Sequence, residues 1–124
     1  MRVARVALAT AAVALAGCQS SGPSDTGTFS EAQTLFSSLQ ETMTTCWFSG
    51  DPAFAAYVYT PEINAGTPRI LIVQKDEPTA LPLLVIEAKG RANADIYGPL
   101  LASAEGPRIR ADLDRWIKGG RGCA

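Results

Sequence analysis

The sequence predicts an α+β fold, a two-layer sandwich in which both helices lie on one face of a four-stranded antiparallel sheet. Two patterns predict it. Apolar residues recur every three or four positions near residues 29–47 and 107–118, as they do in amphipathic helices. Between these segments lie four short alternating or aliphatic runs, which are typical of strands. The order helix, four-stranded meander, helix buries all apolar faces in two layers.

The first helix is expected from residue 29 to residue 47. Its apolar side chains share one face and are Phe29, Ala32, Phe36, Leu39, Met43 and Trp47. Thr28 and Glu31 fit a capping box, because the hydroxyl and the carboxylate can each accept a bond from an unpaired backbone amide. The sequence Ser49-Gly50-Asp51-Pro52 should end the helix.

Four strands are expected at residues 54–60, 69–74, 83–88 and 92–97. The breaks between them are short enough for hairpin connections, so a meander is the simplest topology. In the fourth strand, Ala92, Ala94 and Ile96 should point inward. Residues 100–102 fit either a fifth strand or a loop.

The closing helix is expected from residue 107 to residue 118. Pro107 suits a first helical turn, and Gly119 suits a left-handed stop. The apolar stripe of this helix contains Ile109, Leu113, Trp116 and Ile117.

Residues 1–17 have the pattern of a secretory signal. Arg2 and Arg5 form a basic lead, and residues 6–16 are uncharged and apolar. That run is shorter than the roughly 20 residues that a helix needs to span a bilayer. It closes with Leu15-Ala16-Gly17-Cys18, which resembles the lipobox of bacterial lipoproteins.

The resemblance implies that cleavage occurs before Cys18 and that Cys18 carries lipid, which anchors the chain to a membrane. Ala14-Leu15-Ala16 leaves a second possibility open, an ordinary secretory cut after Ala16. Gln19 is not the aspartate that favours inner-membrane retention, so the resemblance favours the outer membrane, facing the periplasm. Residues 18–28 are expected to be a flexible tether, and residues 29–124 one small periplasmic domain.

If Cys18 carries lipid, Cys46 and Cys123 remain as an even pair. A secreted location permits disulfides, and both residues follow the ends of predicted helices. We therefore expect a Cys46–Cys123 disulfide. A buried free thiol at Cys46 with a free Cys123 is the alternative.

The composition excludes several functions. The chain has no histidine, which removes histidine-dependent catalysis and most zinc sites. No glycine-rich phosphate loop or Ser-x-x-Lys arrangement is present. Loss of Arg2 and Arg5 leaves nine basic residues against twelve acidic ones, which argues against nucleic-acid binding. We expect no catalytic residue, cofactor or metal.

Two sets of residues are candidates for a contact surface. The cations of the closing helix, chiefly Arg108, Arg110 and Arg115, suit an acidic partner, or simply a solvated helix face. Tyr57 and Tyr59, joined by Tyr97, suit an aromatic patch on the open face of the sheet, or plain packing between strands.

The Cys46-Trp47 pair that ends the first helix, with the closing Cys123, resembles the periplasmic carboxy-terminal domains of the TolA and TonB type. That family places a helix between its strands, which this chain does not. The expected anchor, the short tether, the small disulfide-closed domain and the missing catalytic groups predict a non-enzymatic, lipid-anchored envelope protein. We expect it to bind another envelope protein or to support an envelope assembly. The alternative is a lipoprotein that binds a small ligand or glycan, or inhibits a hydrolase.

Overall fold

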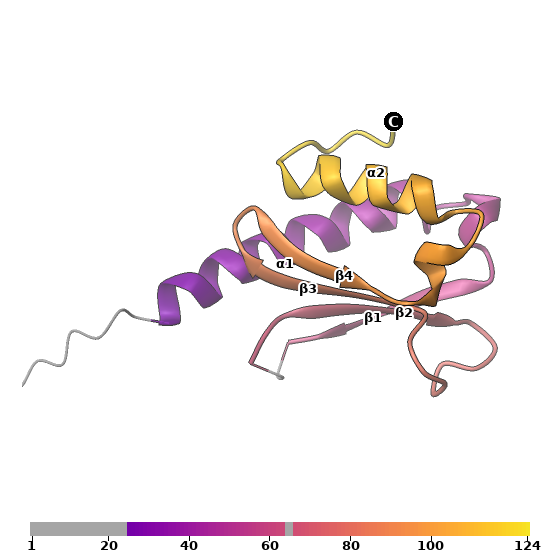
Figure 1. Cartoon of the computed structure of the whole chain (residues 1–124), viewed down its shortest axis with the longest axis horizontal. Coiled ribbons are helices and arrows are strands. Elements are labelled where there is room, and N and C mark those ends of the chain that lie inside the picture. Colours follow the sequence, from indigo (N-terminus) through magenta and orange to yellow (C-terminus); the bar gives the residue numbers. More distant parts are fainter. Residues whose placement is uncertain (1–24, 64–65) are drawn as a thin grey trace, which may run out of the picture.

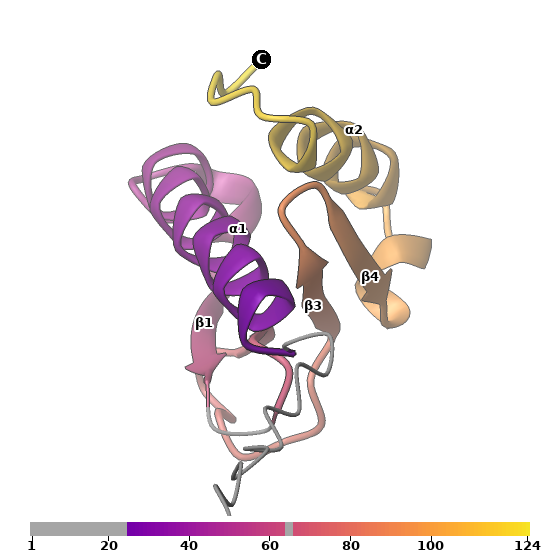
Figure 2. The same ribbon diagram turned by 90° about the vertical axis from the view of Figure 1, so that its left-hand side faces the viewer.

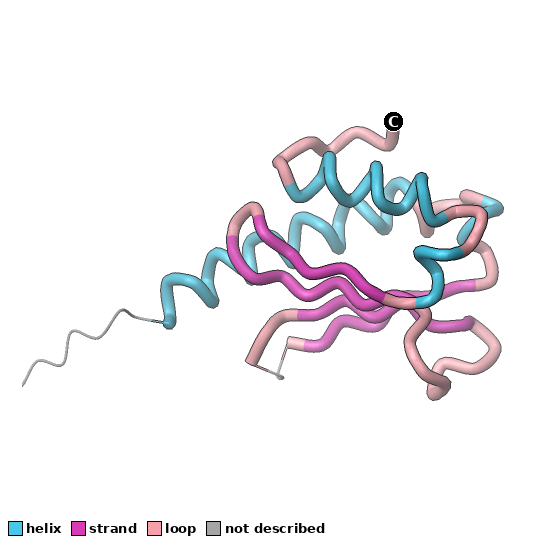
Figure 3. Tube along the Cα trace, viewed as in Figure 1, coloured by secondary structure: helices cyan, strands magenta, loops and turns pink. Residues whose placement is uncertain are grey.

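The computed structural model describes residues 25–63 and 66–124. The expected signal peptide (1–17), Cys18 and the first part of the expected tether lie outside the described residues. The elements in chain order are α1 (Asp25–Cys46), η1 (Pro52–Phe54), β1 (Tyr57–Glu62), β2 (Arg69–Gln74), β3 (Leu84–Gly90), β4 (Asn93–Tyr97), η2 (Pro99–Ala102) and α2 (Gly106–Ile117) (Figure 3).

The four strands form one antiparallel sheet in the order β1-β2-β3-β4, so the expected meander is confirmed. Both helices lie on the same side of this sheet (Figures 1 and 2). Helix α1 packs mainly against β3, and α2 packs beside α1 and against η2. The fold is therefore the expected two-layer α+β sandwich.

The core lies between the helices and the sheet. Helix α1 and the residue after it contribute the predicted stripe, of which the buried members are Ala32, Phe36, Leu39, Met43 and Trp47. Helix α2 contributes Ile109, Leu113 and Trp116. The sheet contributes aliphatic side chains at alternate positions, namely Ile70, Ile72, Leu84, Ile86 and Ala88. The apolar side chains that recur about every 3.6 residues in the helices thus pack against those that recur every two residues in the strands.

Helix α1 begins earlier than expected. It includes Asp25 and the residues after it, so Thr28 lies inside the helix and the proposed capping box of Thr28 with Glu31 is wrong. Cooperative helix formation explains the extension, because a helix fixed by its buried stripe can add polar residues at little cost. The last four residues expected in the tether are therefore helical.

Two further boundaries differ. Residues 52–54 form η1 rather than the start of a strand, because Asp51 Oδ1 accepts the Ala53 amide and Pro52 suits the first helical turn. Residues 99–102 form η2, so residues 100–102 are neither a strand nor an irregular loop. In β4, Ala94 and Ile96 pack against the core as expected, but Ala92 is exposed in the preceding turn.

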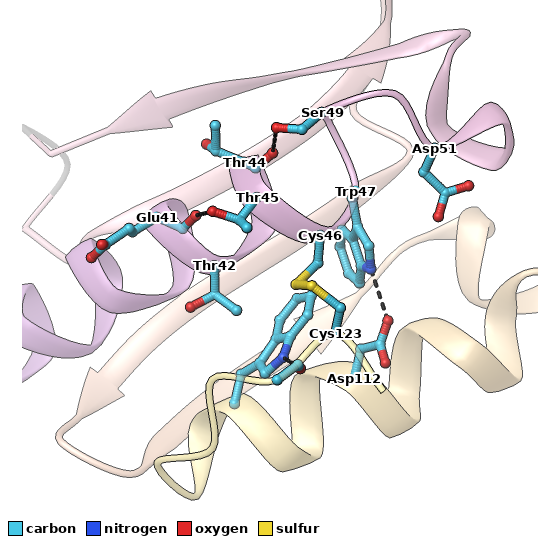
Figure 4. The surroundings of a disulfide bond; sticks show 12 residues. Glu41, Thr42, Thr44, Thr45, Cys46, Trp47, Ser49, Asp51, Asp112 and Cys123 are labelled. Carbon is cyan, nitrogen blue, oxygen red and sulfur yellow. Dashed lines mark hydrogen bonds between the residues drawn. A yellow bond between two sulfur atoms is a disulfide. The ribbon is translucent and has the colours of Figure 1, made fainter.

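The C-terminal segment returns to the end of α1, where Cys46 and Cys123 form the expected disulfide (Figure 4). Gly119 has the predicted left-handed backbone, with φ of 103°. Beyond it, the Gly122 carbonyl accepts hydrogen bonds from the Trp116 indole at 2.8 Å and from the Arg115 guanidinium at 2.9 Å. The tail is thus held by one covalent bond and by side chains of α2.

Candidate binding site at the end of helix α1

Aromatic rings gather where α1 ends. Gly50, with φ of 106°, reverses the chain after the helix, and η1 then brings Phe54 back onto Trp47. The two rings stack with centroids 4.6 Å apart and planes 7° apart. Phe48 contacts the Phe54 ring edge-on at 5.9 Å and the Tyr59 ring at 5.3 Å. Such aromatic pairs add stability beyond the apolar area that they bury.

A pocket of about 320 Å³ opens beside this cluster. Its walls come from the end of α1, from η1 and from the paired ends of β1 and β2. The lining residues are Trp47, Phe48, Gly50, Asp51, Phe54, Ala55, Tyr57, Val58 and Lys75. Trp47 and Phe54 are buried, so Phe48, Ala55, Tyr57 and Val58 form most of the accessible apolar wall. The pocket combines an apolar body with a few polar groups, which is the usual make-up of a binding site.

Each oxygen of the Asp51 carboxylate accepts a hydrogen bond from within the chain. Its Oδ1 accepts the Ala53 amide and its Oδ2 accepts the Arg108 guanidinium, which also lies over the Phe54 ring at 5.2 Å. The Arg108 hydrogen bond is the main reason that the pKa of Asp51 is held below its ordinary value, with the Ala53 amide second. The same pair raises the pKa of Arg108.

This pairing predicts an acid-dependent contribution to stability. Because the folded-state pKa of Asp51 is lowered, the contribution is present above about pH 5 and is lost as the pH falls through that lowered pKa. Wild-type protein should therefore be more stable than Asp51→Asn near neutral pH, and the difference should disappear in acid. Carboxyl-carbon NMR titration would give the pKa directly. In Arg108→Gln the pKa of Asp51 should rise, and a wild-type pKa at or above the ordinary value would contradict the assignment.

Asp112 holds Trp47, one of the residues that line the pocket. It is only 4 % exposed, and its Oδ2 accepts the Trp47 indole N–H at 2.8 Å (Figure 4). Its Oδ1 accepts the Arg115 guanidinium at 2.8 Å, and Arg108 Nε lies 3.6 Å from Oδ2. One buried carboxylate therefore fixes the ring at the base of the pocket and balances two cations of α2.

The tyrosines do not share one surface. Cross-strand partners lie on the same face of a sheet, and Tyr59 is opposite the buried Ile72. Tyr57 and Tyr59 pack against the core on the face covered by the helices, and the Tyr59 hydroxyl lies 2.8 Å from Thr44 Oγ1. Tyr97 is opposite Val85 on the other face. The expectation of one open-face tyrosine patch is wrong, and of the three only Tyr57 lines the pocket.

The arginines of α2 also separate. Arg108 reaches the rim of the pocket through Asp51, whereas Arg115 is engaged by Asp112 and the C-terminal tail. Arg110 is exposed beside Asp114 and Ile117 and lines a shallow depression next to β4. Arg108 and Arg115 are thus paired within the chain, whereas Arg110 is exposed, and a contact surface on this helix stays a prediction.

The open face of the sheet carries a row of paired charges. Glu62, Arg69, Glu87 and Asp95 lie opposite one another in successive strands. Arg69 pairs with Glu62, and Lys89 Nζ lies 3.1 Å from Glu87 Oε2. Tyr97 donates to Glu87 at 2.6 Å, which lowers the pKa of Glu87 and raises that of Tyr97. The charged groups of this face are therefore paired with one another across neighbouring strands.

Within residues 25–63 and 66–124, no three acidic, histidine or cysteine side chains are placed to hold a metal ion. The described part of the chain also contains no helix with both the length and the apolar character needed to cross a bilayer. No family model, curated protein or solved structure matches this chain. Its function is therefore inferred from its own residues and geometry.

Proposed function

We propose that this protein is a non-enzymatic, lipid-anchored envelope protein that binds another envelope protein through the aromatic pocket at the end of α1. The lipobox-like Leu15-Ala16-Gly17-Cys18 supports the anchor. The pocket is the single observation that supports binding, because it places accessible apolar side chains beside charged ones on a rigid base. The absence of histidine from the chain leaves few routes to catalysis.

The position of the pocket suits a tethered protein. Helix α1 has 22 residues and is therefore about 33 Å long. The pocket lies at the C-terminal end of α1, and a lipidated Cys18 would precede its N-terminal end. Only residues 19–24 separate Cys18 from α1, and six residues span at most about 20 Å. The pocket is thus at the end of α1 opposite the lipid.

The anchor is tested by intact-mass analysis of detergent-extracted protein. We expect a chain that begins at Cys18 and carries acyl chains, and two additional hydrogen atoms after reduction of the Cys46–Cys123 disulfide. A Cys18→Ser variant should lose the lipid. A lipid-free chain beginning at Gly17 would instead support the ordinary secretory cut and contradict the anchor.

Partner binding is tested by site-specific crosslinking in intact cells. A photoreactive phenylalanine analogue in place of Ala55, which is exposed at the pocket, should form a reproducible adduct with one envelope protein. The same analogue in place of Ala111, which is exposed on α2, is the matched control. The adduct should be identified by mass spectrometry and reproduced from the partner's side. Adducts from neither position, or equally from both, would contradict the proposal.

A further inference from the structure

The charges around the pocket indicate what kind of partner segment it binds. We propose that the pocket takes an apolar side chain, best an aromatic one, from a peptide segment of the partner in which a carboxylate lies next to that side chain. This inference rests on the proposed function and specifies the chemistry of the same site. The apolar group would enter between Phe48, Ala55 and Tyr57, and the carboxylate would meet Lys75.

The pocket is at the small end of the range for ligand sites, which suits a single side chain of a peptide. Sites that enclose small molecules occupy roughly 300–1,000 Å³, and the volume here is about 320 Å³. The pocket is also partly open to solvent, and Gly50 borders open space, since a Cβ placed there would meet no atom within 4 Å. A ring attached to a peptide can thus enter while its backbone stays outside.

The polarity of the rim follows from which charges are already paired. Asp51 is already paired with Arg108 and also accepts the Ala53 amide, so its charge is balanced within the chain. In the described part of the chain, no carboxylate oxygen lies within the 4.0 Å limit of an ion pair to Lys75 Nζ. Asp76 and Glu77 follow Lys75 in the chain but do not line the pocket. Lys75 is thus the charge that remains for an incoming carboxylate.

The Tyr57 and Phe48 rings add a second reason for an aromatic guest. Both are only partly buried and pack against the core, and Phe48 also contacts the Phe54 and Tyr59 rings. A further ring can therefore extend the cluster in an edge-on or offset arrangement, which aromatic pairs prefer. Aromatic residues are also enriched at the centres of protein interfaces.

The test uses three capped tetrapeptides, Gly-Trp-Glu-Gly, Gly-Trp-Gln-Gly and Gly-Gly-Glu-Gly, titrated into ¹⁵N-labelled mature protein in detergent. Saturable NMR shifts should appear at Gly50, Ala55 and Lys75. The Trp-Glu peptide should bind about two- to fivefold more tightly than the Trp-Gln peptide, as expected of one exposed ion pair. The peptide without Trp should not bind measurably.

Two variants with matched controls identify the groups. Lys75→Glu should reverse the order of the Glu and Gln peptides, whereas Arg91→Glu, at a side chain 77 % exposed in the β3–β4 turn, should leave the order unchanged. Ala55→Phe should fill the pocket and abolish binding, whereas Ala111→Phe should not. Equal affinity of the two Trp peptides in wild type, an unchanged order in Lys75→Glu, or no saturable shift at millimolar peptide would each overturn the inference.

These outcomes separate the inference from the proposed function. A partner crosslinked specifically through Ala55, together with peptides that show no preference for the carboxylate, would leave the function standing and overturn the chemistry. Peptide binding with the expected preference, but no envelope protein crosslinked in cells, would support the chemistry and contradict the function.

Discussion

Removing the disulfide is expected to lower the free energy of unfolding by about 4.5 kcal/mol. Cys46 and Cys123 are 77 residues apart, and the chain-entropy model assigns this value to a loop of that length. Domains of this size are stable by only about 5–15 kcal/mol. The double variant Cys46→Ala with Cys123→Ala should therefore be marginally folded. Urea denaturation followed by Trp47 and Trp116 fluorescence gives the difference.

Wild-type protein measured with and without reductant is the control, because reduction removes the same bond without changing a side chain. The reduced protein and the double variant should agree closely, since Cys46 is largely buried and its replacement by alanine removes only one sulfur atom. A difference below about 1 kcal/mol between oxidised and reduced protein would contradict the prediction.

Much of the fold could be predicted because its elements have strong local patterns. The apolar stripe that runs from Ala32 to Trp47 keeps the helical period over several turns. The aliphatic runs of β2 and β3 are too short for a typical helix and have the length of strands. The disulfide was predicted because Cys18 lies in the lipobox-like sequence and Cys46 and Cys123 remain as an even pair. The helix and strand signals are each contained in a short stretch of sequence, and the disulfide needs only a count of cysteines.

The faces of the tyrosines could not be predicted in the same way. Alternation shows that Tyr57 and Tyr59 share a face, but not which layer covers that face. The covering layer is decided by α1, whose Thr44 meets the Tyr59 hydroxyl and whose following Phe48 meets the Tyr59 ring. The pocket was missed for a different reason. Eight of its nine lining residues lie within residues 47–58 and the ninth is Lys75, so its shape depends on how the chain folds back after α1, which no residue pattern shows.

Asp112, in contrast, left a signal in the sequence. It follows Ile109 by three positions and precedes Trp116 by four, so it lies on the apolar stripe of α2. A carboxylate at such a position needs partners, and the buried Trp47 indole needs an acceptor. The two requirements satisfy each other, although no local pattern shows that residues 65 positions apart would meet.

The disulfide and the pocket belong to one connected structure. Cys46 directly precedes Trp47, whose indole is bound by Asp112. Asp112 in turn binds Arg115, which donates to the carbonyl of Gly122, the residue before Cys123. The covalent bond and these hydrogen bonds close a ring behind the pocket, so the two strongest constraints at this end of the fold stabilise the same aromatic wall.

Replacing Asp112 by alanine is therefore expected to cost about 3 kcal/mol, near the lower end of the range for breaking a buried ion pair. The Trp47 indole N–H would lose its acceptor, and Arg108 and Arg115 would lose a counter-charge. Both arginine side chains are about one-third exposed, so water can solvate them and limit the loss. Urea denaturation measures this cost, and Trp47 emission should change because its hydrogen bond is gone.

Two further variants separate the hydrogen bond from the charge. Asp112→Asn keeps an oxygen acceptor for Trp47 but removes the charge, so it should cost about half as much as alanine, near 1.5 kcal/mol. Asp114→Asn removes an exposed carboxylate that pairs with Lys118, and its effect should stay below about 0.5 kcal/mol. If Asp112→Ala were no more destabilising than Asp114→Asn, Asp112 would not be the centre of this end of the fold. The contacts of Asp112 require that the loss of stability is largest for Asp112→Ala, smaller for Asp112→Asn and smallest for Asp114→Asn.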